Sequence, residues 1–168
     1  SGNAVVLDLR GHTITTATRN RLFLVSGYLA VMDTVGGGRL SARTPSATGD
    51  YGGVVRIVDN ETTGSMFELF SGTITPASAS EKARFGGLVS VGSGGTFRMH
   101  DGMLFGGNSV GNGGGIYVES TTAKAIFSLL SPRPIKLITS DSAKTVHMEL
   151  IEVLPPLAAK SQSSSGRT

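Results

Sequence analysis

The chain contains no cysteine, so it can hold neither a disulfide framework nor a thiolate metal site. That absence is compatible with the cytosol and with the exterior of an anaerobe. No apolar run approaches the roughly 18 residues of a membrane span, and the N-terminal stretch SGNAVVLDL lacks the basic-then-apolar pattern of a signal peptide. We therefore expect no membrane span and interpret the chain as a piece excised from a longer protein.

Charge and metal-binding side chains are also sparse. The 15 basic and 12 acidic residues leave a net charge of +3, and the basic residues are scattered, with Arg19 and Arg21 the nearest to a cluster. This composition argues against a nucleic-acid partner. The three histidines, His12, His100 and His147, lie far apart and form no HExxH motif. We expect no metal and no cofactor.

Glycine, in contrast, is abundant at 24 of 168 residues, about twice the usual share. Part of it belongs to an internal repeat, in which YGGVVRIVD, FGGLVSVGS and NGGGIYVES begin at Tyr51, Phe85 and Asn112. An earlier copy begins at Leu22 without the paired glycines. The matched apolar positions, at spacings of 32, 34 and 27 residues, are Phe23, Val55, Val89 and Ile116. Such a period predicts a solenoid.

Within each copy, apolar residues alternate with period two, as strands with one buried face require. The second strands align Leu29, Phe67, Phe97 and Phe127 at one inward position, and short third strands follow Gly11, Gly72 and Gly102. Three strands joined by turns stack as a parallel coil at about 4.8 Å per turn. The predicted single core is Val55, Ile57, Phe67, Leu69, Val89, Val91, Phe97, Met99, Ile116 and Val118.

The paired glycines are interpreted as corners of this coil, where positive φ or close backbone approach excludes a side chain. The structural glycines are Gly52, Gly53, Gly86, Gly87, Gly113 and Gly114. A phosphate-binding loop would need its glycines between a strand and a helix. The glycine-rich stretch Gly106–Gly115 instead precedes Ile-Tyr-Val, which is typical of a strand.

Two motifs, LDLRGHTI (Leu7–Ile14) and FGGNSVGNGGGIYV (Phe105–Val118), resemble right-handed parallel β-helix proteins of the pectin-lyase-like type. They are most similar to repeat regions of bacterial surface proteins and adhesins, including polymorphic outer-membrane protein repeats. The resemblance covers residues 4–130 and implies an all-β, single-stranded right-handed parallel β-helix of four to five turns. We expect a β-helix domain over 1–154, with terminal strands in Pro134–Val153 and a polar tail or linker over 155–168.

The resembled fold also includes polysaccharide lyases and glycoside hydrolases, so carboxylates in register were considered as catalytic. The repeat places Asp33, Ser71 and Asp101 in one column, with the two acids about 9.6 Å apart, near the upper end of inverting-glycosidase spacing. His100 would be a third acid–base group. A cleft would require walls from the loops Thr34–Asp50 and Ile74–Arg84. Asp before Gly, as at Asp101, is also ordinary turn chemistry.

Outward positions are better placed for binding. The candidate binding-face residues are Arg56, Tyr117, Glu68, Arg98, Phe70 and His100, with Glu68 and Arg98 expected as an exposed ion pair between turns. Met32, Phe70 and Leu130 would form an apolar line, so self-association through this face or through open β-helix ends is a further expectation. We therefore predict a non-enzymatic module, secreted or at the bacterial cell surface, acting as an adhesin or stalk for host protein or glycan. The alternative is a carbohydrate-active enzyme.

Overall fold

The chain forms a parallel β-solenoid. The computed structural model describes residues 4–44, 51–58, 62–128 and 136–139, and within these ranges there are fourteen strands and no helix. The strands form three sheets, and every pairing of neighbouring strands is parallel. The all-β solenoid predicted from the repeat is confirmed.

The three sheets are here called A, B and C in the order in which the chain visits them. Sheet A contains β1 (Ala4–Asp8), β4 (Tyr28–Met32), β7 (Ser65–Leu69), β10 (Gly95–Met99) and β13 (Lys124–Phe127). Sheet B contains β2 (Thr13–Arg19), β5 (Arg39–Arg43), β8 (Thr73–Pro76), β11 (Met103–Gly107) and β14 (Lys136–Thr139). Sheet C contains β3 (Phe23–Val25), β6 (Val55–Ile57), β9 (Val89–Val91) and β12 (Ile116–Val118).

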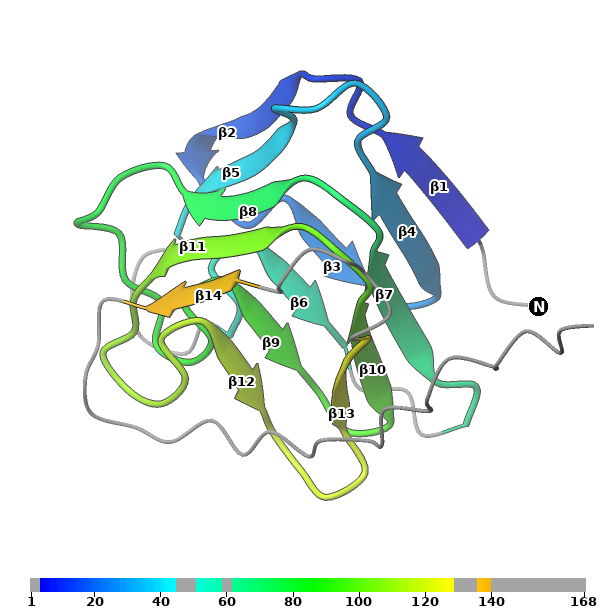
Figure 1. Cartoon of the computed structure of the whole chain (residues 1–168). Helices are drawn as coiled ribbons and strands as arrows, with labels where there is room; N and C mark the ends of the chain where they lie inside the picture. Colours follow the sequence, from blue (N-terminus) through cyan, green and yellow to red (C-terminus); the bar gives the residue numbers. More distant parts are fainter. Residues whose placement is uncertain (1–3, 45–50, 59–61, 129–135, 140–168) are drawn as a thin grey trace, which may run out of the picture.

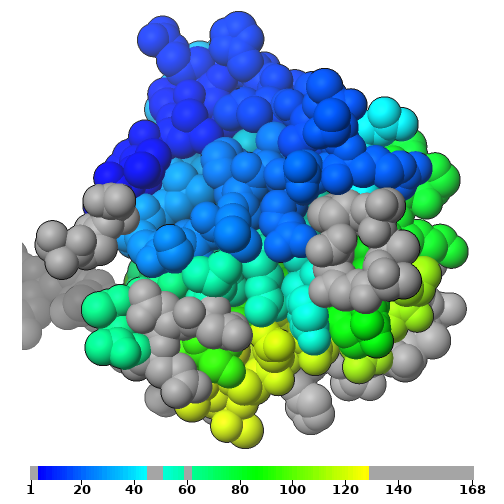
Figure 2. Space-filling model, turned by 180° about the vertical axis from the view of Figure 1, so that it is seen from behind, coloured from blue at the N-terminus to red at the C-terminus, as the bar shows by residue number. Residues whose placement is uncertain are grey.

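The chain passes from sheet A to B to C and then returns to A one turn further along, for about four turns (Figure 1). Seen from behind, the surface runs from blue at one end to yellow at the other, as successive turns stack along one axis (Figure 2). Each corner between sheets therefore brings together residues about 30 positions apart in the sequence.

The pairing register agrees with the repeat over most of its length. Phe23 pairs with Val55, Val55 with Val89 and Val89 with Ile116, so the four matched positions form one ladder in sheet C. In sheet A, Leu29, Phe67 and Phe97 also share one ladder. Identical inward positions thus stack directly above one another and pack as one core.

The predicted place of Phe127 in this ladder is wrong. Phe97 pairs with Ala125, and Phe127 lies beside Met99, two positions further on. Both registers point the same side chains inward, because the side-chain period of a strand is two. Alternation alone could not separate them, and the length of the turn before β13 decided the register.

The predicted core is confirmed except at Val118. The other nine residues are buried in a single cluster, where the Phe67 and Phe97 rings stack with centroids 5.5 Å apart. Val118 is 40% exposed, because β12 is the last strand of sheet C among the described residues.

The glycine corners follow a common plan. The first glycine of each pair, Gly52, Gly86 or Gly113, has a positive φ of 64–71°. At the second position the backbones approach closely, since a Cβ on Gly53 would lie 2.1 Å from the Gly87 carbonyl oxygen. Gly53 also donates its amide to the Gly86 carbonyl at 2.9 Å. Gly52, Gly53, Gly86, Gly87 and Gly113 thus each have the positive φ or the close backbone approach that leaves no room for a side chain.

Two segments differ from the expectation. Thr34–Asp50 is not only a loop, because it contains β5, which pairs with β2 and β8. Within the predicted terminal strands, β14 pairs in parallel with β11 and so adds a strand to sheet B. Residues 140–153 and the predicted tail over 155–168 lie outside the described residues. No helix in the described part of the chain is long and apolar enough to cross a membrane.

Candidate functional site

The outer face of sheet A carries a set of polar side chains that interact across successive turns. Because Phe67 and Leu69 of β7 point into the core, Met66 and Glu68 point outward. The register gives two outward columns, of which one is Tyr28, Met66, Thr96 and Lys124 and the other is Ala30, Glu68, Arg98 and Ile126. Side chains from three successive turns therefore meet at Glu68.

Glu68 is the centre of a network that we call the Glu68 cluster, comprising Tyr28, Glu68, Arg98 and His100. The Tyr28 hydroxyl donates to Glu68 Oε2, Arg98 Nη1 donates to Oε1 at 3.2 Å, and His100 Nε2 lies 3.0 Å from the same oxygen. The predicted Glu68–Arg98 contact between adjacent turns is confirmed. Its predicted exposure is wrong for Glu68, which is only 7% exposed, because its three partners converge on the carboxylate.

The electrostatics favour an ionised Glu68. Burial raises its pKa, but the hydrogen bonds from Tyr28 and His100 and the charge of Arg98 outweigh burial, so the pKa lies below its ordinary value. In turn, the hydrogen bond to Glu68 raises the pKa of Tyr28. A carboxylate held in this way is a fixed negative charge and a fixed acceptor, and it is a poor proton donor near neutral pH.

An aromatic platform lies directly beside this cluster. The Phe70 ring stacks on the His100 ring with centroids 4.3 Å apart and planes inclined by 3°. Phe70 remains 39% exposed. The predicted apolar line of Met32, Phe70 and Leu130 is thus partly covered, since Met32 is half-buried and Phe70 packs on a polar ring. Leu130 lies outside the described residues.

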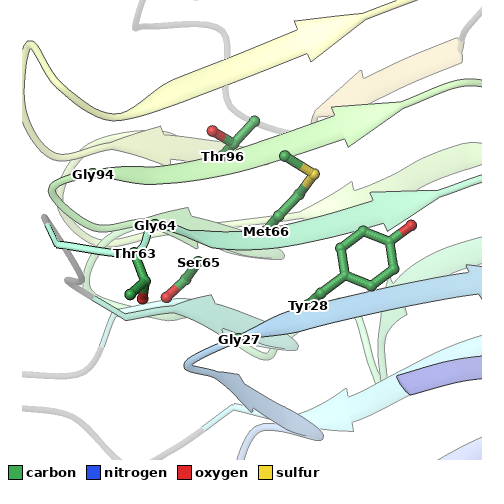
Figure 3. A pocket seen from close by; sticks show the side chains of 8 residues that line it. All are labelled: Gly27, Tyr28, Thr63, Gly64, Ser65, Met66, Gly94 and Thr96. Carbon is green, nitrogen blue, oxygen red and sulfur yellow. The ribbon is translucent and has the colours of Figure 1, made fainter. Parts of the chain in front are cut away.

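A shallow pocket of about 280 Å³ adjoins the cluster at Tyr28. Tyr28, Met66 and Thr96 project into it from three neighbouring strands (Figure 3). Ser65, which also lines the pocket, is buried, and its hydroxyl has no hydrogen-bond partner among the described residues. Unpartnered buried hydroxyls are uncommon, but this one lies on the same inward face as Phe67 and Leu69, so the polar side chains in the pocket wall are Thr63 and Thr96.

The other predicted binding residues, Arg56 and Tyr117, lie on sheet C, so the structure does not bring the six binding-face residues together. Arg56 is 11% exposed at its side chain and pairs with Glu119 at 2.9 Å. Its guanidinium also covers the Tyr51 ring, 4.4 Å from the centroid. Tyr51, Phe85 and Tyr117 pack against one another with centroids 5.0–5.9 Å apart. This cluster ties three turns together and leaves its cation largely covered.

The predicted column of Asp33, Ser71 and Asp101 follows the strands of sheet A, where the chain turns toward sheet B. Asp33 accepts backbone amides at both carboxylate oxygens, from Gly11 and Gly38, each at 2.7 Å. Burial raises the pKa of Asp33, but these hydrogen bonds outweigh it and the pKa is lowered. Asp101 accepts the amide of Gly102 at 2.7 Å. His100 contacts Glu68.

The segment Ile74–Arg84, one of the two that would wall a catalytic cleft, runs elsewhere. Glu81, in the segment after β8, accepts the Thr44 amide at 3.0 Å and the Thr44 hydroxyl at 2.6 Å, at the end of β5. These contacts hold Ile74–Arg84 at the corner between sheets B and C, whereas Asp101 lies at the corner between sheets A and B.

Sequence reasoning missed Tyr28 and Glu81. Tyr28 was detectable, because the aligned register places it in the outward column of Met66. Glu81 was not, since it lies in a non-repeating segment whose path the period does not describe. In the part of the chain that is described, no three His, Asp or Glu side chains gather closely enough to hold a metal ion.

Fold and site together define the chain as a parallel β-solenoid with a polar and aromatic outer face. No protein-family model, curated protein or solved structure matches it.

Proposed function

We propose that this β-solenoid is a non-catalytic binding module, an adhesin or stalk unit of a bacterial surface or secreted protein, that binds a glycan on the outer face of sheet A. The observation that carries the proposal is the exposed Phe70 ring, fixed by stacking on His100 beside the ion-paired Glu68. A fixed aromatic face packs against the apolar face of a sugar ring, and adjacent charged groups bond its hydroxyls.

The neighbouring pocket supports the same function. Its wall combines Tyr28 and Met66 with the side chains of Thr63 and Thr96. Ligand sites of this kind combine apolar surface with a few convergent polar groups. A glycan that extends from Phe70 toward Tyr28 would cover both parts of the face.

The alternative is a polysaccharide lyase or glycoside hydrolase using Asp33, Asp101 and His100. A general acid needs a raised pKa near neutral pH. The pKa values of Asp8, Asp33, Glu68 and Glu81 are instead all lowered, for Asp8 chiefly by the hydrogen bond from the Thr34 side chain. Both oxygens of Asp33 are occupied by backbone amides. These features support binding over catalysis.

A glycan array followed by affinity measurement tests the proposal. Phe70→Ala should weaken binding of the best glycan about five- to tenfold, the range expected for losing one aromatic contact. Phe105→Ala is the matched control, because Phe105 is a similarly exposed phenylalanine on sheet B. Affinity in that variant should stay within about twofold of the parent.

An array without hits, or equal losses in the two variants, would refute glycan binding on sheet A. If the chain still binds host cells after the cells are treated with glycosidase, and no longer binds them after protease treatment, the partner is a protein and not a glycan. Cleavage of an array glycan would favour the enzyme instead.

A further inference from the structure

The corner between sheets B and C gathers basic side chains that lie far apart in the sequence. Arg19 ends β2 and Arg43 ends β5, and the two are register partners on adjacent turns. Lys82 and Arg84 lie in the segment that follows β8 and projects at this corner (Figure 1). We call Arg19, Arg43, Lys82 and Arg84 the basic corner.

The buried carboxylate of Glu81 contacts two of the four side chains of the basic corner. Its carboxylate lies 3.4 Å from Arg19 Nη1 and 3.9 Å from Arg43 Nε. The Glu81 side chain is 5% exposed, whereas those of Arg19 and Arg43 are 55% and 50% exposed. One buried carboxylate therefore positions two guanidinium groups whose outer edges remain in solvent.

The other two cations are oriented by the same segment. Ala83 is buried and bridges to Ser109 of the next turn, while Lys82 and Arg84 on either side of it are exposed. The Arg84 guanidinium lies over the Phe85 ring, 5.2 Å from its centroid. Arg84 is three residues from Glu81, so its backbone lies within about 11 Å of the carboxylate residue.

Among the residues that the structure describes, a single carboxylate lies at this corner. Six carboxylates occur in the described ranges, and five lie elsewhere. Asp8, Asp33 and Asp101 lie at the corner between sheets A and B, Glu68 lies on sheet A, and Glu119 follows sheet C. The described carboxylate at the basic corner is thus Glu81, which contacts Arg19 and Arg43, while Lys82 and Arg84 add two further cationic side chains. Such a field attracts anions and concentrates them at the surface.

We propose that the basic corner binds a sulfated glycan. Guanidinium groups pair with the oxygens of oxyanions such as sulfate in bidentate geometry, and sulfate esters remain charged at all physiological pH values. A nucleic acid fits less well, because single strands need aromatic stacking platforms and a duplex needs an element that enters a groove. The ring nearest the corner, Phe85, is covered by Arg84 and stacked on Tyr51. This inference does not rest on the function proposed for sheet A.

Binding of heparin, used as the sulfated probe, to the 168-residue chain tests the proposal. The variant Lys82→Gln/Arg84→Gln should weaken heparin binding about tenfold at 0.15 M salt and reduce the slope of log affinity against log salt by roughly 2. The matched control is Arg39→Gln/Lys124→Gln, which removes the same charge from exposed positions at the other two corners. Its affinity should change by less than about twofold. Melting temperatures establish that each variant folds, and Lys82→Gln alone serves if the double variant does not.

The parent chain should bind heparin and should not bind desulfated heparin, which would support recognition of the sulfate groups. The Phe70→Ala variant should bind heparin as tightly as the parent, which would separate the basic corner from the sheet A site. Absence of heparin binding, or equal weakening in the two double variants, would overturn it. An oligonucleotide of equal charge that binds at least as tightly would also overturn it, in favour of a nucleic-acid partner.

Discussion

At the scale of single residues, two nearly buried glutamates organise the outer surface. Glu68 joins Tyr28, Arg98 and His100 across three turns, and Glu81 joins Thr44 to Arg19 and Arg43. Each carboxylate takes its partners from different turns. Removing one partner from such a group leaves a buried charge partly unpaired, which is more costly than losing an exposed ion pair.

The pH dependence of stability follows from Glu81. The Thr44 hydrogen bond lowers its pKa against the opposing effect of burial, and the charge of Arg19 lowers it further, below the ordinary value of 4.5. Because the folded-state pKa is the lower one, ionised Glu81 stabilises the fold fully above about pH 4.5, and this stabilisation is lost as the pH falls through the folded-state pKa. Glu81→Gln should therefore be less stable than the parent at pH 7, and the difference should shrink on acidification.

Urea unfolding of both proteins between pH 7 and pH 3 measures this. Asp101→Asn is a suitable control, because Asp101 bonds only the adjacent Gly102 amide among the contacts described above. A stability difference between parent and Glu81→Gln that stayed constant over the whole pH range would contradict the role assigned to the ionised carboxylate.

At the scale of elements, the corners explain why so much glycine is present. In the stretch GNGGGIYV, Gly113 has a φ of 67°, and a Cβ there would lie 2.1 Å from the Ile116 carbonyl oxygen. The glycine serves a sharp turn that enters β12 directly. Gly113 therefore meets two requirements at once, a positive φ and the absence of a Cβ.

Comparing two glycines separates these requirements. Gly36 also has a positive φ, of 96°, but a Cβ there would meet nothing within 4 Å. Gly36→Ala should cost about 1–2 kcal/mol from backbone strain alone. Gly113→Ala should cost at least about 1 kcal/mol more, because the methyl group must displace backbone.

Thermal and urea unfolding of the two single variants give the difference directly. Equal losses of stability would mean that the Ile116 carbonyl moves away at little cost. Gly113 would then be required for its positive φ and not for lack of space for a Cβ.

At the scale of the whole molecule, strands differ in how many neighbouring turns support them. β7 lies between β4 and β10 and carries the fully buried Phe67 and Leu69. β1 pairs with β4 alone among the described strands, and Val5, at an inward position of the ladder, is 53% exposed. In repeat architectures each turn is supported only by its neighbours, so the turn containing β1 has about half the support of a central one.

Hydrogen exchange should reveal this gradient. Amides of β1 should exchange at least about tenfold faster than amides of β7 in dilute protein, because local opening costs less where fewer contacts are broken. Mass spectrometry of peptides covering the two strands measures the ratio. Equally slow exchange would show that the open edge of β1 is covered, and a dependence on protein concentration would identify a second copy as the cover.

Local patterns determined the strands, their inward faces and the glycine corners, because a period of two and a need for positive φ are properties of short segments. They therefore predicted the ladder of Phe23, Val55, Val89 and Ile116 and the neighbours Glu68 and Arg98. Because these patterns are local, they could not place Phe127, since pairing it with Phe97 or with Met99 buries the same face of the strand.

Only the tertiary structure decided which outward side chains meet. Tyr28 reaches Glu68 from another turn, and Glu81 reaches Arg19 and Arg43 because a non-repeating segment crosses the corner between sheets B and C. These contacts depend on loop paths and side-chain directions, which hydrophobic period does not encode. The solenoid thus follows from the sequence, while both candidate binding surfaces follow from how its turns are stacked.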